Sequence, residues 1–160
     1  MQIELFTTGG TFDKIYFDAL SEFTIGAPQA PSLLLAANTS CAIAVTELLR
    51  KDSLELTGQD RALIAARVAA SAADRVIITH GTDTMAETGR AIAASDKTVV
   101  LVGAMQPAAM RDSDAAFNLG FAVAAVQLAA PGVYIAMNGE LLMAAQARKD
   151  RDAKRFIAAD

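Results

Sequence analysis

The sequence predicts an α/β fold: an open, mainly parallel sheet flanked by helices, forming one three-layer α/β/α domain over residues 1–160. Three observations lead to this prediction. Short runs of apolar residues alternate with longer helical stretches, as parallel βαβ units require. Polar loops follow several of these runs directly. A chain of 160 residues, of which 53% are hydrophobic, can bury one sizeable core and is too short for a second full domain.

Five short apolar runs are predicted to be buried strands, and four of them are rich in Val and Ile, which strands favour. They are Ile3–Phe6, Ala42–Thr46, Arg75–Thr79, Thr98–Val102 and Val133–Met137. Three helices are predicted among the later strands, each starting at a plausible N-terminal cap. They are Asp60–Ala73, Asp83–Ala94 and Asp114–Ala130. The segment Phe12–Pro31 is predicted to be irregular, and long loops of this kind are often lids.

Three loops follow predicted strands immediately and carry most of the polar residues of interest. They are Thr7–Thr11, His80–Thr84 and Gly103–Asp112. In an open parallel sheet the ligand crevice lies beyond the carboxyl ends of the strands. We therefore expect these loops to converge at one rim and to form the functional site there.

Charge and hydrophobic patterning argue against two kinds of partner. A net charge of −4 and a pI near 4.9 disfavour nucleic acid, which is bound by basic surfaces. No apolar stretch reaches the roughly 18 residues that a membrane-spanning helix needs, and the N-terminus lacks the features of a secretory signal. We expect a cytoplasmic protein with a small-molecule substrate.

The first loop contains Thr8-Gly9-Gly10-Thr11, in which two glycines allow a sharp turn with its amide groups close to a ligand. The dinucleotide and P-loop glycine signatures are absent, so we do not expect a nucleotide. The hydroxyl groups of Thr8 and Thr11 can serve as nucleophiles if a neighbouring base removes the proton. The alternative is an ordinary turn or an anion-binding nest.

The second loop crowds polar residues onto the start of a predicted helix. His80 is the only histidine, and metal sites usually need three or more ligands, so we interpret it as a hydrogen-bonded residue and predict no metal. Lys149 and Tyr16 are then the candidate bases. Alternatively, Thr82 caps the helix and Asp83 is favoured by the helix dipole.

Two of these motifs together resemble the active-site signatures of the bacterial-type L-asparaginases and glutaminase-asparaginases. They are Thr8-Gly9-Gly10-Thr11 and His80-Gly81-Thr82-Asp83-Thr84-Met85. Further segments are similar to the same family, and the resemblance covers nearly the whole chain. They are Val102-Gly103-Ala104-Met105-Gln106-Pro107, Phe117-Asn118-Leu119 and Met137-Asn138.

The resemblance implies a role for each matching residue. Thr11 matches the primary nucleophile, and Tyr16 matches the tyrosine of a lid that activates it. Thr82, Asp83 and Lys149 match a second catalytic cluster. The implied reaction is hydrolysis of L-asparagine to L-aspartate and ammonia through an acyl-enzyme intermediate, with no metal or organic cofactor.

The same resemblance implies a set of substrate-binding residues. The segment Lys51–Thr57 is similar to the family's segment that holds the α-carboxylate of the substrate, which assigns this role to Asp52 and Ser53. Gly10, Thr82 and Asp83 complete the predicted substrate site. Alternatively, Asp52 and Ser53 simply end a strand.

In one respect the sequence departs from the family pattern. Usual members carry a second α/β domain, whereas this chain ends at Asp160, so we expect a short form that lacks it. Its apolar content then favours a homo-oligomer. Three other functions remain open: an amidohydrolase for glutamine, an ammonia-supplying subunit of an amidotransferase, and a non-catalytic module that binds an amino acid.

Overall fold

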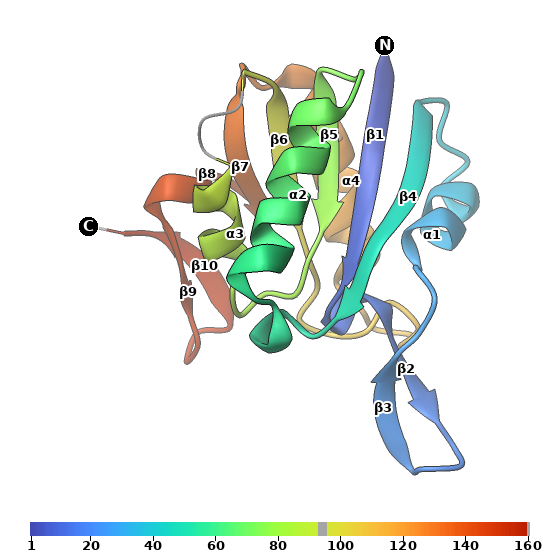
Figure 1. Ribbon diagram of the computed structural model, residues 1–160. Coiled ribbons are helices and arrows are strands. Elements are labelled where there is room, and N and C mark those ends of the chain that lie inside the picture. The colour runs from blue at the N-terminus through green and yellow to red at the C-terminus, as the bar shows by residue number, and fades with distance from the viewer. Residues whose placement is uncertain (93–95, 160) are drawn as a thin grey trace.

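The computed structural model describes residues 1–92 and 96–159 and contains a six-stranded sheet with helices on both faces (Figure 1). Its strands lie in the order β4-β1-β5-β6-β7-β8, and only β8 runs antiparallel to its neighbour. The mainly parallel α/β fold is therefore confirmed. The six strands are β1 (Gln2–Gly9), β4 (Ala42–Lys51), β5 (Arg75–Thr79), β6 (Thr98–Val102), β7 (Gly132–Met137) and β8 (Glu140–Met143).

Within the described residues, four α-helices flank the sheet, and the three predicted ones are all present. They are α1 (Ala30–Ala36), α2 (Gly58–Ala70), α3 (Met85–Ala91) and α4 (Ala115–Leu128). A capping box between Thr57 and Asp60 starts α2 two residues before its predicted beginning. Helix α4 is shorter at both ends than the predicted helix Asp114–Ala130. The predicted helix that corresponds to α3, Asp83–Ala94, extends into residues 93–95, which lie outside the described part of the chain.

The two faces of the sheet bury separate apolar clusters, because successive side chains of a strand point to opposite faces. On one face, Ile64 of α2 and Met85 of α3 pack with Ile78. On the other, Leu119 of α4 packs with Ile77. The central strands are thus covered on both sides, which explains why they are continuous apolar runs in the sequence.

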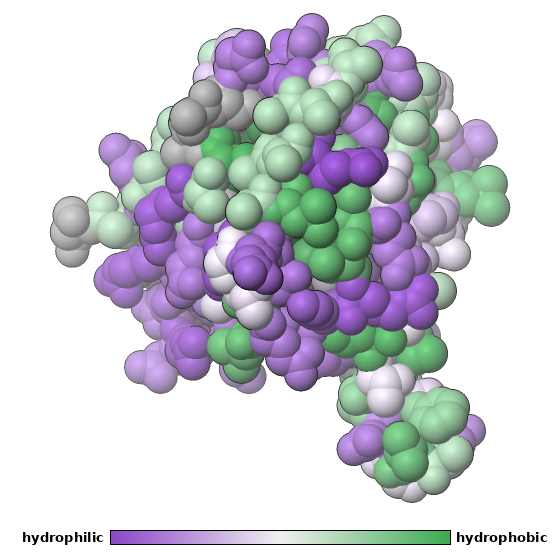
Figure 2. All heavy atoms as spheres, in the orientation of Figure 1, coloured by the Kyte–Doolittle hydropathy of each residue, from purple (hydrophilic) through white to green (hydrophobic). Residues whose placement is uncertain are grey.

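The prediction that Phe12–Pro31 is irregular was wrong. This segment contains a 3-10 turn (Thr11–Asp13), an antiparallel hairpin and the start of α1, whose first turn includes a proline. The hairpin consists of β2 (Lys14–Phe17) and β3 (Glu22–Ile25), and it projects from the body of the domain (Figures 1 and 2). A second hairpin, β9 (Ala147–Asp150) with β10 (Arg155–Ala158), was also missed.

Candidate functional site

Two glycines bring the first two predicted loops into direct contact. Gly10, at the end of β1, has a φ of 76°, and a Cβ atom there would lie 2.4 Å from the Cα of Gly81. Only glycine fits such an approach. Because β1 and β5 are neighbours in the sheet, their loops meet at its carboxyl edge, and Thr11 and Thr82 each follow one of the touching glycines.

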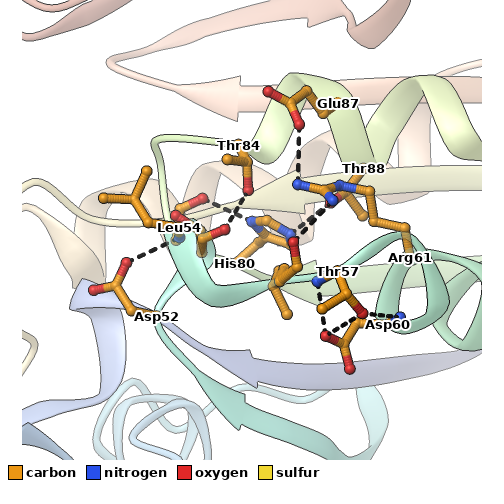
Figure 3. Close-up of polar contacts among 12 residues, drawn as sticks. Asp52, Leu54, Thr57, Asp60, Arg61, His80, Thr84, Glu87 and Thr88 are labelled. Atoms are coloured by element: carbon orange, nitrogen blue, oxygen red, sulfur yellow. Dashed lines mark hydrogen bonds and ion pairs between the residues drawn. The ribbon is translucent and has the colours of Figure 1, made fainter.

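A third segment, between β4 and α2, packs against the same contact. A Cβ atom on Gly81 would lie 2.6 Å from Ser53 Oγ, so the serine is held directly against the loop. Thr84 Oγ1 donates a hydrogen bond of 2.8 Å to the carbonyl oxygen of Ser53 (Figure 3). Ser53 is only 2% exposed. The structure therefore brings this residue, which was predicted to bind substrate, to the predicted rim.

Asp52, the neighbour of Ser53, shapes this segment and links it to the hairpin. Its carboxylate accepts a hydrogen bond from the backbone N–H of Leu54 (Figure 3) and forms an ion pair of 3.0 Å with Lys14 of β2. These two interactions lower the pKa of Asp52, although partial burial acts in the opposite direction and is the largest single influence. Asp52 therefore holds the base of the hairpin beside the site.

Lys149 reaches the site from β9 although it is 66 residues away from Asp83 in the chain. Its ammonium group donates hydrogen bonds to Thr82 Oγ1 at 2.7 Å and to Asp83 Oδ1 at 3.0 Å. Arg151 also lies 3.5 Å from Asp83 Oδ1. Thr82 is 5% exposed, so the hydroxyl and the amine are positioned with little freedom to rotate. A proton can pass along the 2.7 Å contact between them.

His80 supports this loop from beneath. Its ring is fully buried, and burial lowers its pKa to about 4, so the imidazole is neutral at pH 7. Nδ1 lies 2.7 Å from the carbonyl oxygen of Gly81 and Nε2 lies 2.8 Å from Thr88 Oγ1 (Figure 3). Because a carbonyl only accepts, Nδ1 carries the proton and Nε2 accepts from Thr88. The expectation of a hydrogen-bonded histidine is confirmed.

Tyr16 lies apart from the other predicted site residues. It is 53% exposed on β2, and its ring packs edge-to-face on Phe23 with 5.6 Å between the centroids. The structure thus assembles Gly10, Ser53, Thr82, Asp83 and Lys149 at one rim and leaves Tyr16 on the projecting hairpin (Figure 1).

Asp13 is a further residue of the site that the sequence did not single out. It is 2% exposed, and burial raises its pKa to about 6. Its carboxylate accepts a hydrogen bond of 2.8 Å from the backbone N–H of Gln29. Its carbonyl oxygen accepts one of 2.8 Å from the N–H of Gly26, and its own N–H donates to the carbonyl oxygen of Gly10. It therefore ties the chain after the hairpin to the Gly10 turn. An acidic residue directly after the apolar Phe12 was the only signal in the sequence.

The described residues 1–92 and 96–159 contain no helix that is long and apolar enough to cross a membrane. Within the same residues, no group of three or more His, Cys, Asp or Glu side chains is placed to hold a metal ion. The polar groups at the rim are thus the hydroxyl, amine and carboxylate side chains already described, together with the backbone of the glycine turns.

The chain matches a known protein family over nearly its whole length. A family model described as "Asparaginase, N-terminal" matches residues 2–157. The chain therefore belongs to the asparaginase family, and it corresponds to the N-terminal part of its members.

Two L-asparaginases illustrate this relationship. That of Thermococcus kodakarensis is 28% identical over 156 residues, which are 93% of this chain and 48% of that protein. Its solved structure superimposes with a TM-score of 0.87 at 26% identity, covering 99% of this chain and 51% of the other. A probable cytoplasmic L-asparaginase from Campylobacter jejuni gives a TM-score of 0.85 at 33% identity, with 99% and 53% covered.

A third relative is described as part of an amidotransferase and not as an asparaginase. It is a component of the glutamyl-tRNA(Gln) amidotransferase of Methanococcus vannielii and is 42% identical over 72 residues, which are 43% of this chain and 17% of that protein. The chain thus spans about half of the asparaginases and much less of this amidotransferase component.

Proposed function

We propose that this chain hydrolyses the side-chain amide of L-asparagine to give L-aspartate and ammonia. The observation that carries the proposal is the position of Lys149 Nζ, 2.7 Å from Thr82 Oγ1 and 3.0 Å from Asp83 Oδ1, beside the contact between the Gly10 and Gly81 loops. A hydroxyl, an amine and a carboxylate that lie beside the backbone of two glycine-containing loops are suited to acyl transfer.

In the proposed reaction, Thr11 Oγ1 attacks the side-chain carbonyl carbon of the substrate. Its proton passes to the leaving amine, so that ammonia departs and an aspartyl ester remains on Thr11. Water then attacks the ester, and its proton returns to Thr11 as the ester bond breaks. Thr82 and Lys149 would transfer protons and place the water, while backbone N–H groups near Gly10 would stabilise the oxyanion.

The amino-acid end of the substrate needs groups of both charges. Asp83 is partly exposed and carries the negative charge that an α-ammonium group requires. Ser53, with the backbone beside Asp52, would hold the α-carboxylate, and the Ser53 side chain already faces the Gly81 loop. Tyr16 would approach Thr11 only after its hairpin closes over the bound substrate.

The decisive experiment is an ammonia-release assay with asparagine on the wild type and on Thr11→Ala and Thr82→Val. We expect release from the wild type and a loss of about 10³-fold or more in both variants, because nucleophile and proton transfer are removed separately. Thr39→Ala, in the loop before β4, is the matched control and should keep full activity. Absence of release from the wild type would refute the proposal.

A second candidate is ammonia release from glutamine, favoured by the similarity to the amidotransferase component. The same assay with glutamine and small peptides separates the two, because the preferred amide has the highest kcat/KM. Binding of asparagine without any release would instead indicate a non-catalytic amino-acid-binding module.

We also propose that these 160 residues suffice for the reaction, as a cytoplasmic homo-oligomer without metal or cofactor. Activity of the purified 160-residue chain in the presence of a chelator would support this proposal. A requirement for an added C-terminal half would contradict it.

A further inference from the structure

The contact between Thr82 and Lys149 joins two sheets that share no ladder of hydrogen bonds. Thr82 follows β5 of the six-stranded sheet, whereas Lys149 lies in β9, which pairs with β10 in a two-stranded sheet of its own. A hairpin of two strands is marginally stable at best when isolated in water. Contacts outside the hairpin must therefore hold it where Lys149 reaches the hydroxyl.

Apolar burial keeps the hairpin on the domain but does not set its orientation. The hairpin packs beside β8 (Figure 1), and Ala147 and Phe156 are buried in the apolar cluster on the α2 and α3 face of the sheet. The hydrophobic effect that drives this burial is non-directional. A hydrogen bond from Lys149 to Thr82 requires a narrow range of distance and angle, which calls for directional contacts as well.

One such contact comes from Asn138, in the turn between β7 and β8. Its side-chain oxygen Oδ1 accepts a hydrogen bond of 3.2 Å from the backbone N–H of Phe156. Phe156 is the residue of β10 that lies directly opposite Lys149 in the register of the hairpin. Asn138 thus holds the hairpin at the level of Lys149.

The backbone of Asn138 indicates that its side chain has a use. Its φ is 57°, in the left-handed region where glycine is the least strained residue. Asparagine tolerates this region better than most residues that carry a Cβ atom. The turn therefore keeps a side chain at a position where glycine would be less strained, and the oxygen of that side chain accepts from the hairpin.

Asn118 of α4 fixes the position of Asn138. It is 1% exposed, and its Oδ1 accepts a hydrogen bond of 3.2 Å from the backbone N–H of Asn138. Its amide nitrogen donates to Asp114 Oδ2 at 2.9 Å and to the carbonyl oxygen of Gly103 at 3.1 Å. Because a carbonyl oxygen only accepts, the amide of Asn118 has one orientation, with its oxygen facing Asn138.

The same amide also supports the loop that carries Thr82. A Cβ atom on Gly103 would lie 3.1 Å from Thr82 Cγ2, so the backbone that accepts from Asn118 lies directly against this threonine. Asn118 therefore connects the segment beside Thr82 with the turn that contacts the hairpin of Lys149.

We propose that Asn138 is a positioning residue, which fixes the β9–β10 hairpin so that Lys149 Nζ stays within hydrogen-bond distance of Thr82 Oγ1. This inference rests on the proposed function, in which protons pass between these two groups. A displacement of about 1 Å at such a contact can lower a rate by about 100-fold. The effect should appear in kcat more than in KM, because the contact serves the chemical step.

The variant Asn138→Gly tests this role with little risk to the fold. It removes the acceptor for the N–H of Phe156, while glycine adopts the positive φ without strain. We expect kcat for ammonia release from asparagine to fall by about 100-fold, with KM within about threefold of the wild type. Asn38→Gly is the matched control, because Asn38 is an exposed asparagine with a φ of 48° outside the site, and it should keep the kcat of the wild type.

A conservative variant and a double variant separate positioning from a general loss of structure. Asn138→Asp keeps an acceptor oxygen for the hairpin and should retain kcat within about threefold of the wild type. In a Lys149→Met background, Asn138→Gly should lower kcat no further, because both changes act on the same interaction.

Crystal structures of the wild type and the Asn138 variants provide a readout that does not depend on activity. The distance from Lys149 Nζ to Thr82 Oγ1 should exceed about 3.5 Å in Asn138→Gly. It should stay near 2.7 Å in the wild type and in Asn138→Asp. If the wild type releases no ammonia, the proposed function fails, and this distance still decides whether Asn138 positions Lys149.

Three results would overturn the proposal. The first is an unchanged distance between Lys149 and Thr82 in Asn138→Gly. The second is a kcat of Asn138→Gly within about threefold of that of an active wild type. The third is an equal loss of kcat from Asn138→Gly in the presence and absence of Lys149, because the asparagine would then act by another route.

Discussion

Two buried titratable residues beside the site should make opposite contributions to stability as the pH changes. Burial raises the pKa of Asp13 from 3.8 to about 6, with a smaller contribution from Glu47, while the N–H of Gln29 and the charge of Arg50 act against it. Burial lowers the pKa of His80 from 6.5 to about 4. Each residue is more easily buried in its neutral form.

Proton binding sets the sign of each contribution. Between about pH 4 and 6 the native state keeps a proton on Asp13 that the unfolded chain releases, so stability falls as the pH rises through this window. For His80 the unfolded chain binds the extra proton between about pH 6.5 and 4, so stability falls as the pH drops. Each shift corresponds to about 3 kcal/mol at about 1.4 kcal/mol per pKa unit. The two effects nearly cancel in the wild type.

The variant Asp13→Asn separates the contribution of Asp13 to the pH dependence of stability from that of His80. The asparagine side-chain oxygen can still accept from the N–H of Gln29, but it does not titrate. The variant should therefore lose about 3 kcal/mol of stability between pH 7 and pH 4 through His80 alone, whereas the wild type shows a much flatter profile. Urea denaturation at fixed ionic strength across this pH range measures the free energy of unfolding of the variant and of the wild type. Asp18→Asn, at the exposed tip of the β2–β3 hairpin, is the control and should give the profile of the wild type. Parallel profiles for Asp13→Asn and the wild type would refute the reasoning.

Two further predictions concern the site. Lys149→Met removes the ammonium group that contacts both Thr82 and Asp83. The kcat for ammonia release, measured with saturating asparagine, should therefore fall by about 10³-fold. A kcat within about threefold of the wild type would exclude a role in proton transfer. Gly10→Ala would place a Cβ atom 2.4 Å from the neighbouring loop at a φ of 76°. Calorimetry should therefore show that the free energy of unfolding falls by at least about 2 kcal/mol. Gly58→Ala, with open space around its Cβ, is the control and should show no loss of stability.

The strands could be predicted because their burial leaves a direct trace in the sequence. Thr98–Val102 has the same bounds in the prediction and in β6, since both of its faces are covered and every residue is buried. β4 instead continues past its predicted end to Lys51 with half-buried and exposed residues, because it lies at the edge of the sheet. An apolar run marks only the part of a strand that is covered.

The site could be predicted only in part. Convergence of the Thr11 and His80 loops follows from the geometry of parallel strands, but no local pattern places Lys149 beside Thr82, because that contact joins residues 67 positions apart. Only the family resemblance pointed to it. The hairpin carrying Tyr16 was missed because its large apolar residues are exposed, so they show no alternation between buried and exposed positions.

We propose that the same hairpin connects the chemistry of the site to a change of conformation. Asp13 holds the chain after β3 and Lys14 is paired with Asp52, so the base of the hairpin is fixed to the rim of the candidate site. The hairpin exposes Tyr16 and Phe23 by about half each. Closure over a bound substrate would bury these rings, and at about 25 cal/mol per Å² even 100 Å² contributes roughly 2.5 kcal/mol. Substrate affinity and hairpin closure would then be linked, because a ligand that completes the surface on which the rings pack stabilises the closed state.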